Sequence, residues 1–340
     1  MNVPLHRISW IALMACAPAV LAWTCWGPLA GLAGLSLGAF AVLFGSFNTM
    51  PWLYRPRPSY EETDRRAIHW PEALPLESFR GNDRLLFCVH GFPSTPADFR
   101  KVEGLSNEAG WDLFAPLLPG CGTSPAELVR GGGWDQYLAY IEDRWMELRP
   151  RYRVACLVGS SMGGSLCLAL AERLAGRGEL EPDALATIGS PAVLNAFIRH
   201  GIVKNPLIYA ARTLGALVPM IGARYPEEPR EGEDGDDDWK GYLGIYPRLT
   251  YTMQTGLRAM DRRLKDVRCP TLICHATGDR IVPFENAALI ARGLGSSRIE
   301  LYAANMDGYG HARHNLILYD SQRDAVWRRV LSFFADNIQR

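Results

Sequence analysis

The sequence has no excess of charge of either sign. Its 340 residues include 36 Lys or Arg and 36 Asp or Glu, so the formal net charge is zero. It also lacks any basic stretch interleaved with aromatic residues. Because nucleic-acid binding depends on clustered positive charge, these absences argue against it as the main task and predict no nucleic-acid partner.

The cysteines do not show the spacing of a metal site. None of the eight forms the C-x-x-C or C-x-x-H pattern typical of zinc ligands. Residues 227–238 include eight acidic residues among twelve and could attract a cation, but they lack the D-x-D-x-D-G spacing of a calcium loop. We expect a solvated loop there, and we predict no metal and no cofactor. Cys88, Cys156 and Cys274 lie in apolar runs, which indicates buried free thiols in a reducing compartment.

Charge is also missing from residues 8–47, which contain no Asp, Glu, Lys or Arg. A helix that crosses a bilayer needs about 20 apolar residues, and this stretch is about twice as long. Gly27-Pro28 interrupts it near its middle. We therefore expect two transmembrane helices, at about 8–26 and 29–47, in an anchor formed by residues 1–50. The alternative is a cleaved signal peptide, which would leave the second apolar half unexplained.

Positive residues flank the two expected helices. Arg7 precedes the first helix, and Arg55 and Arg57 follow the second. Lys and Arg favour the cytoplasmic side of a membrane. The pattern predicts a helical hairpin in the inner (cytoplasmic) membrane, with the catalytic domain in the cytoplasm. The sequence leaves the oligomeric state open.

Residues 51–80 are rich in proline and charge, and we interpret them as a linker. In residues 81–340, short apolar runs alternate with helical patterns. The expected strands are 85–90, 112–117, 153–159, 184–189, 271–275 and 299–303. The expected helices are 97–108, 134–149, 162–174, 285–294 and 321–338. This alternation predicts an α/β fold with a mostly parallel sheet and helices on both faces.

One interval interrupts the alternation. About 80 residues separate the expected strands 184–189 and 271–275. Two apolar segments, 198–221 and 242–260, flank the acidic run within it. We interpret residues from about 191 to 265 as a cap inserted between two strands.

The strongest chemical signal is the G-x-S-x-G pattern at residues 159–163. It follows an expected strand and opens an expected helix, which is the context this motif requires. The turn holds the central serine, Ser161, in a strained backbone conformation, and a side chain at Gly159 or Gly163 would clash with the adjoining strand and helix. Ser161 is therefore the predicted nucleophile. Ser160 lies off the centre of the motif and is expected to be structural.

A serine nucleophile needs a base for its proton and donors for the oxyanion. The segment His90-Gly91-Phe92-Pro93 follows the first strong strand. We predict that the backbone N–H groups of Phe92 and Met162 form the oxyanion hole, and that His90 supports this loop.

A carboxylate and a histidine follow later strands, in the order Ser, Asp, His. Asp279 comes after the expected strand 271–275, at the sheet edge where α/β active sites form. Two histidines, His311 and His314, precede the final helix. The order of residues does not separate them, so His311 remains an alternative base.

These motifs resemble the α/β-hydrolase superfamily, and in particular bacterial carboxylesterases and monoacylglycerol lipases. The resemblance covers residues 82–338 and includes the segments 118–125 and 278–283. In that group the catalytic histidine precedes a short apolar stretch and an Asp that opens the last helix. His314, followed by residues 316–318 and Asp320, matches this pattern, so the resemblance favours His314 as the base. The group commonly has histidine where this chain has Cys121, which bears on loop packing and pocket shape.

The resemblance implies an α/β-hydrolase fold and a serine hydrolase that cleaves carboxylic esters. The expected N-terminal hairpin is not part of the family core, and together with it we expect a membrane-anchored enzyme. The predicted triad is Ser161, His314 and Asp279. An acyl-glycerol or lysolipid is the expected substrate, because the cap and the anchor are apolar. A thioesterase or acyltransferase with the same triad is one alternative. A catalytically dead, membrane-tethered interaction protein is another, which the presence of every expected catalytic residue argues against.

Overall fold

The structure is a computed structural model and describes residues 20–21, 23–49, 54–194, 210–226, 234, 239–306 and 313–338. A seven-stranded sheet forms its centre, in the order β1-β3-β2-β4-β5-β8-β9. The strands are β1 (Leu76–Ser78), β2 (Arg84–Val89), β3 (Asp112–Ala115), β4 (Val154–Ser160), β5 (Ala184–Ile188), β8 (Thr271–Ala276) and β9 (Ile299–Ala304). All neighbours are parallel except β1 and β3. The predicted α/β hydrolase-type sheet is therefore confirmed.

Each expected strand is present, and β1 is an additional one. It is a three-residue strand that pairs antiparallel with β3, Leu76 opposite Ala115. It lies within the segment interpreted from sequence as a linker, so the end of that segment is part of the sheet. Arg100 also fixes the segment, because its guanidinium donates to the carbonyl oxygens of Glu72 and Leu74.

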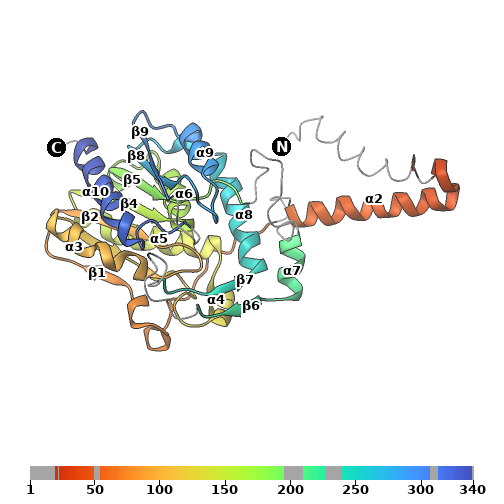
Figure 1. The fold of residues 1–340 in the computed structure, drawn as a ribbon, viewed down its shortest axis with the longest axis horizontal. Helices are drawn as coiled ribbons and strands as arrows, with labels where there is room; N and C mark the ends of the chain where they lie inside the picture. Colours follow the sequence, from red (N-terminus) through yellow and green to blue (C-terminus); the bar gives the residue numbers. More distant parts are fainter. Residues whose placement is uncertain are drawn as a thin grey trace.

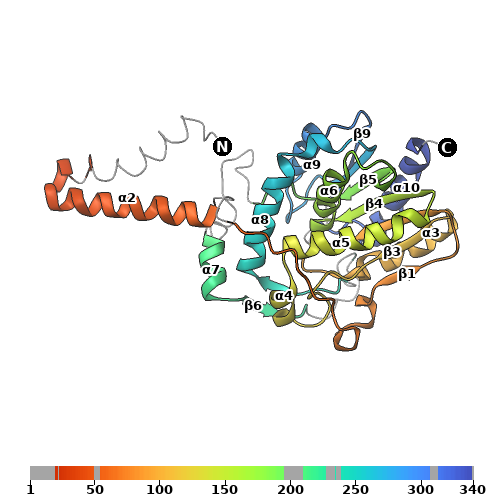
Figure 2. The same cartoon turned by 180° about the vertical axis from the view of Figure 1, so that it is seen from behind.

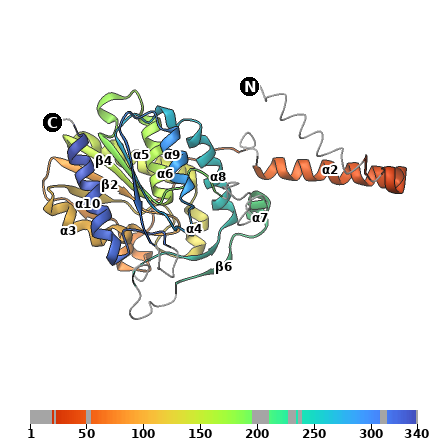
Figure 3. The ribbon, with the colours of Figure 1, turned by 45° about the horizontal axis from the view of Figure 1, so that its top comes forward.

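Helices cover both faces of the sheet (Figures 1 and 3). The 3-10 helix Pro96–Val102, α3 (Glu103–Glu108) and α10 (Asp320–Asn337) pack on one face. On the other face lie α4 (Pro125–Gly131), α5 (Trp134–Leu148), α6 (Met162–Leu174), α8 (Pro247–Asp261) and α9 (Glu285–Gly293). The apolar sides of these helices pack on the apolar side chains of the sheet, and this removes both surfaces from water.

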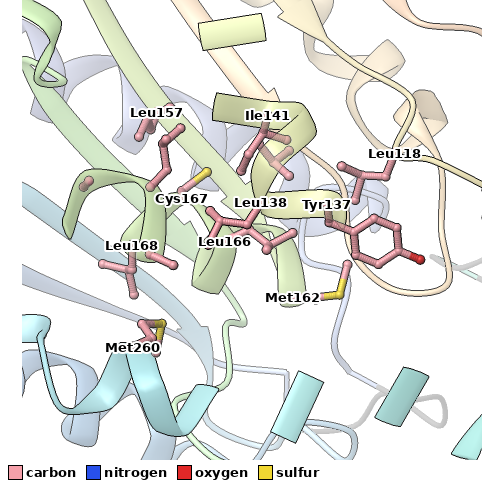
Figure 4. Packing of buried hydrophobic residues seen from close by; sticks show 14 of the residues in the cluster. Leu118, Tyr137, Leu138, Ile141, Leu157, Met162, Leu166, Cys167, Leu168 and Met260 are labelled. Carbon is pink, nitrogen blue, oxygen red and sulfur yellow. The ribbon is translucent and has the colours of Figure 1, made fainter. Parts of the chain in front are cut away.

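The core on the second face is dense around α6. Side chains of α5, β4, α6 and α8 meet there, among them Ile141, Leu157, Leu166 and Met260 (Figure 4). Every residue of α6 except Arg173 is buried. This packing fixes the start of α6, where the G-x-S-x-G turn ends.

The region between β5 and β8 contains α7 (Ala211–Leu217), the two-stranded antiparallel pair β6 (Ile221–Arg224) and β7 (Leu243–Ile245), and α8. Of these, α8 packs against α5 and α6 and contributes Leu249 and Leu257 to the core. Most of the acidic run lies outside the described residues. Its one described residue, Asp234, accepts hydrogen bonds from the N–H groups of Asp320 and Ser321 at the start of α10.

Helix α2 (Pro28–Thr49) projects from the domain on the side away from α10 (Figures 1 and 2). It begins after Gly27, whose φ of +86° lies in the left-handed region and ends the preceding helical segment. Residues Pro28–Asn48 are long and apolar enough to cross a membrane, with a mean hydropathy of 1.8. Most of the first expected span lies outside the described residues. Among the described residues, one helix is a candidate membrane span, and the expected hairpin is not tested. A signal sequence would share the length and composition of this helix.

Candidate active site

Ser161 lies in the sharp turn between β4 and α6. Its φ of 52° and ψ of −125° are a strained combination for a residue with a side chain. The two glycines allow this turn. A Cβ at Gly159 would lie 2.3 Å from the Cα of Gly164, and one at Gly163 would lie 2.0 Å from the carbonyl oxygen of Val89. The predicted clashes of side chains at both positions are thus present, one with the helix and one with a strand.

His314 and Asp279 lie beside this serine. The Nε2 atom of His314 is 2.8 Å from the Ser161 Oγ, and its Nδ1 atom is 2.7 Å from the Asp279 Oδ2. A carboxylate only accepts hydrogen bonds, so Nδ1 carries the proton and Nε2 is left to accept the proton of the serine hydroxyl. Ser161 directly follows β4, Asp279 lies three residues after β8, and His314 lies in the longer connection between β9 and α10. The carboxyl ends of these parallel strands lie at one edge of the sheet.

The Asp279 carboxylate is fully buried and held in place. Its Oδ1 atom accepts hydrogen bonds from the backbone N–H groups of Ile281 and Val282, both at 2.8 Å. His275 lies 3.5 Å from Oδ2 and is bonded through Nε2 to the Val282 carbonyl oxygen. Burial lowers the pKa of His275, so this ring is neutral at pH 7 and donates to Val282. It thereby stabilises the turn that carries the two N–H donors.

The predicted oxyanion loop lies against Ser161. A Cβ at Gly91 would lie 3.0 Å from the Ser161 Cβ, which is tighter than most real contacts, so glycine favours this close approach. Within the described part of the chain, neither the Phe92 N–H nor the Met162 N–H donates a hydrogen bond. Met162 is the first residue of α6, where N–H groups have no partner within the helix. Two donors are thus available beside the serine hydroxyl.

His90 holds this loop in place. It is fully buried, accepts a hydrogen bond from the Leu118 N–H at Nε2, and donates from Nδ1 to the Gly91 carbonyl oxygen. Burial lowers its pKa to about 4, so the ring stays neutral at physiological pH. Its geometry is that of a structural histidine.

A pocket of about 500 Å³ opens above the serine and histidine. One wall comes from the oxyanion loop, and the other comes from the cap and from the loop after β8. The lining residues that sequence reasoning did not identify are Ser94, Pro226, Trp239, Tyr242, Leu243, Gly244, Ile281 and Asn315. Cys121, where the family commonly has histidine, is buried in the core and is not among the residues that line this pocket.

Two further residues, Gly189 and Asn315, lie beside His314, and the sequence gives only weak indications of them. Gly189 ends the expected strand 184–189 with a φ of +62°, and a Cβ there would lie 3.3 Å from the His314 ring. Asn315 directly follows His314 and accepts a hydrogen bond from Ser160, which is buried. The alternative base His311 lies outside the described residues.

The comparisons with known proteins agree with this architecture. The sequence profile of the alpha/beta hydrolase family matches residues 86–329. The chain belongs to this family.

Two curated relatives lie within the expected group. A thermostable monoacylglycerol lipase of Bacillus sp. (strain H-257) is 26% identical over 251 residues, which cover 74% of this chain and 90% of that protein. A carboxylesterase of Bacillus subtilis (strain 168) is 25% identical over 263 residues, 75% of this chain and 94% of that protein. The expected resemblance is thus confirmed, and the chain is an α/β hydrolase of the lipase and esterase type, which acts on esters.

Solved structures share the fold. One of the metagenome-derived lipolytic enzymes LipS and LipT matches with a TM-score of 0.64 at 23% identity, over 78% of this chain and 98% of that one. The monoacylglycerol lipase of Paleococcus ferrophilus matches with a TM-score of 0.60 at 15% identity, over 77% of this chain and 98% of that one. The match to the family model begins at residue 86, after α2.

Proposed function

We propose that this chain is a membrane-anchored serine hydrolase that cleaves carboxylic esters with a lipid acyl chain. The observation that carries the proposal is the continuous hydrogen-bonded series of Ser161, His314 and Asp279, with links of 2.8 and 2.7 Å, at a strained strand-to-helix turn. This arrangement makes a serine hydroxyl nucleophilic.

The reaction would proceed in two halves. The Ser161 Oγ attacks the ester carbonyl while His314 Nε2 takes the hydroxyl proton, and Asp279 stabilises the imidazolium that forms. The N–H groups of Phe92 and Met162 bind the oxyanion of the tetrahedral intermediate. His314 then gives its proton to the leaving alcohol. Water, deprotonated by His314, attacks the acyl-enzyme, and release of the acid restores the serine.

The pocket and the relatives support an acyl substrate. Trp239, Tyr242, Leu243 and Ile281 line the pocket and favour an apolar chain. One relative is named a monoacylglycerol lipase. A monoacylglycerol or lysolipid is the substrate class that we propose.

The membrane anchor is a separate part of the proposal. The support is the length and hydropathy of α2 and the two arginines, Arg55 and Arg57, that follow it. We propose a hairpin in the cytoplasmic membrane with the catalytic domain in the cytoplasm. Reporter fusions at the C-terminus would test the topology, because a reporter active only in the periplasm would contradict it.

The catalytic proposal is tested with the full chain in detergent micelles. Initial rates are measured on p-nitrophenyl esters of four, eight and twelve carbons and on monoacylglycerols of the same lengths. Ser161→Ala and His314→Ala should each lower kcat by roughly 10⁴-fold or more. Ser297→Ala, at an exposed position, and His311→Ala are the controls and should retain most activity.

Two outcomes would change the assignment. Loss of activity in His311→Ala but not in His314→Ala would move the base to the alternative residue. A folded wild type no faster than Ser161→Ala on every ester would refute ester hydrolysis. New esters formed from an added alcohol would indicate acyl transfer instead.

A further inference from the structure

A cavity separate from the acyl pocket lies between the segment after α2, helix α7 and the start of α8. It measures about 880 Å³ and shares no lining residue with the pocket at Ser161. Four arginines, Arg55, Arg57, Arg212 and Arg248, line it, and none of its described lining residues is acidic. The cavity therefore concentrates positive charge in a chain that has no net charge overall.

Three of these arginines lack an anionic partner. Many arginines of the chain pair with carboxylates, as Arg149 does with Asp183 at 3.1 Å. Among the described residues, none of the side chains of Arg55, Arg57 and Arg248 forms an ion pair. Arg248 donates instead to the neutral carbonyl oxygens of Val129, in α4, and of Gly132, which directly follows α4. Burial, with a smaller contribution from the positive charge of Arg57, lowers its pKa.

One carboxylate lies close by and offsets part of this charge. Asp135 accepts hydrogen bonds from the Tyr54 hydroxyl and from the Arg57 backbone N–H. It thereby fixes the segment after α2 against α5. The guanidinium of Arg57 does not pair with Asp135. With four arginines and one neighbouring carboxylate, the cavity keeps a clear excess of positive charge.

The cavity lies directly beyond the end of α2. Asn48, in the last turn of that helix, donates to the Thr213 Oγ1 at 2.8 Å and accepts from the Thr213 N–H at 2.9 Å. Arg212 donates to the Phe47 carbonyl oxygen and packs over the Phe47 ring at 4.2 Å. These contacts hold α7 across the end of α2, as Figures 1 and 2 show. If α2 spans the bilayer, the cavity faces the lipid headgroups.

We infer that this cavity binds the phosphate of an anionic phospholipid headgroup in the leaflet next to α2. Guanidinium groups bind phosphate oxygens in pairs of parallel hydrogen bonds, and several of them converge here. Basic residues at the end of a transmembrane helix are attracted to anionic lipid. The inference rests on the proposed membrane anchor but not on the proposed ester hydrolysis.

The test uses the full chain in dodecyl maltoside micelles. The Tm of the chain is measured at increasing concentrations of phosphatidylglycerol, of phosphatidylcholine and of glycerol 3-phosphate, in separate titrations. A ligand that binds the native state raises Tm. Phosphatidylglycerol alone should raise it. The double variant Arg55→Gln/Arg57→Gln should bind this lipid roughly thirtyfold more weakly, because each basic residue near an anionic membrane surface contributes about a five- to sixfold factor in affinity and the two factors multiply. Both side chains are exposed, so the variant should fold.

The matched control is Arg292→Gln/Arg328→Gln, which removes the same charge from exposed positions outside the cavity and should titrate like wild type. An unchanged response of Arg55→Gln/Arg57→Gln would overturn the inference. An equal response to glycerol 3-phosphate would overturn the lipid as ligand and indicate a soluble phosphate ester. Two further assays on the same samples distinguish failure of this inference from failure of the proposed function. Hydrolysis of p-nitrophenyl butyrate tests the enzyme activity, and flotation with phosphatidylcholine vesicles tests the membrane anchor.

Discussion

Glu172 lies on α6, where its side chain is 5% exposed and its Oε1 atom has no hydrogen-bond partner among the described residues. Burial raises its pKa from 4.5 to about 9, and the nearby Arg263 only partly opposes this shift. The native state therefore keeps a proton that the unfolded chain releases above about pH 4.5. Glu172→Gln replaces the protonated carboxyl with a neutral group of the same shape.

The pH dependence of this effect follows from proton linkage. The contribution of the bound proton to stability is complete below the unfolded pKa and is lost as the pH rises towards about 9. Between these limits the wild type loses about 1.4 kcal/mol of unfolding free energy per pH unit relative to the glutamine variant. From pH 6 to pH 8 the difference should grow by about 3 kcal/mol, which corresponds to roughly 6 °C in Tm for a domain of this size.

The assay is thermal unfolding of the full chain in micelles at half-unit pH steps, followed by tryptophan fluorescence. Glu172→Gln should melt at a higher temperature than wild type, with a gap that widens steadily between pH 6 and pH 8. Glu108→Gln, at an exposed position, is the control and should show no such widening. A gap for Glu172→Gln that stays constant with pH would refute the reasoning, because a constant gap reflects packing rather than ionisation.

Three other substitutions have effects that follow from the structure. Asp279→Asn should lower kcat on a soluble ester by roughly 10⁴-fold with an unchanged circular dichroism spectrum, and a loss below tenfold would count against its role. Gly163→Ala should sharply reduce the yield of folded protein, since its methyl group would meet the Val89 carbonyl oxygen at 2.0 Å, whereas Gly104→Ala has open space and should be harmless in the same expression assay. Trp327→Ala should cost roughly 3–5 kcal/mol in urea unfolding, because the side chain is fully buried, and a cost under about 1 kcal/mol would contradict that packing.

The central strands could be predicted because their apolar runs are continuous, as burial on both faces requires. The edge strand β1 could not, because its three residues include Glu77 and lie in a segment rich in proline and charge. An edge strand buries one side only and needs no such run. Helix 97–108 was predicted as one helix, whereas its first half is a 3-10 helix that begins at Pro96.

The candidate triad could be predicted from motif order, because each member follows a strand whose end lies at the same sheet edge. Its supporting residues were harder to find. His275 acts through a hydrogen bond to the Val282 carbonyl oxygen, and no local pattern specifies that contact. The cap residues Trp239 and Tyr242 reach the pocket through tertiary packing alone.

Strands β5 and β8 are hydrogen-bonded neighbours, with Leu185 opposite Thr271, although the whole cap lies between them in the chain. The chain thus leaves and re-enters the sheet at adjacent points, and a different insert would not alter the pairing of any strand. Helix α8 limits this freedom, since Leu249 and Leu257 belong to the core. The part of the cap before Pro247 can therefore be exchanged as a module, which would change the pocket wall formed by Trp239 and Tyr242 while Ser161 and Asp279 stay where they are.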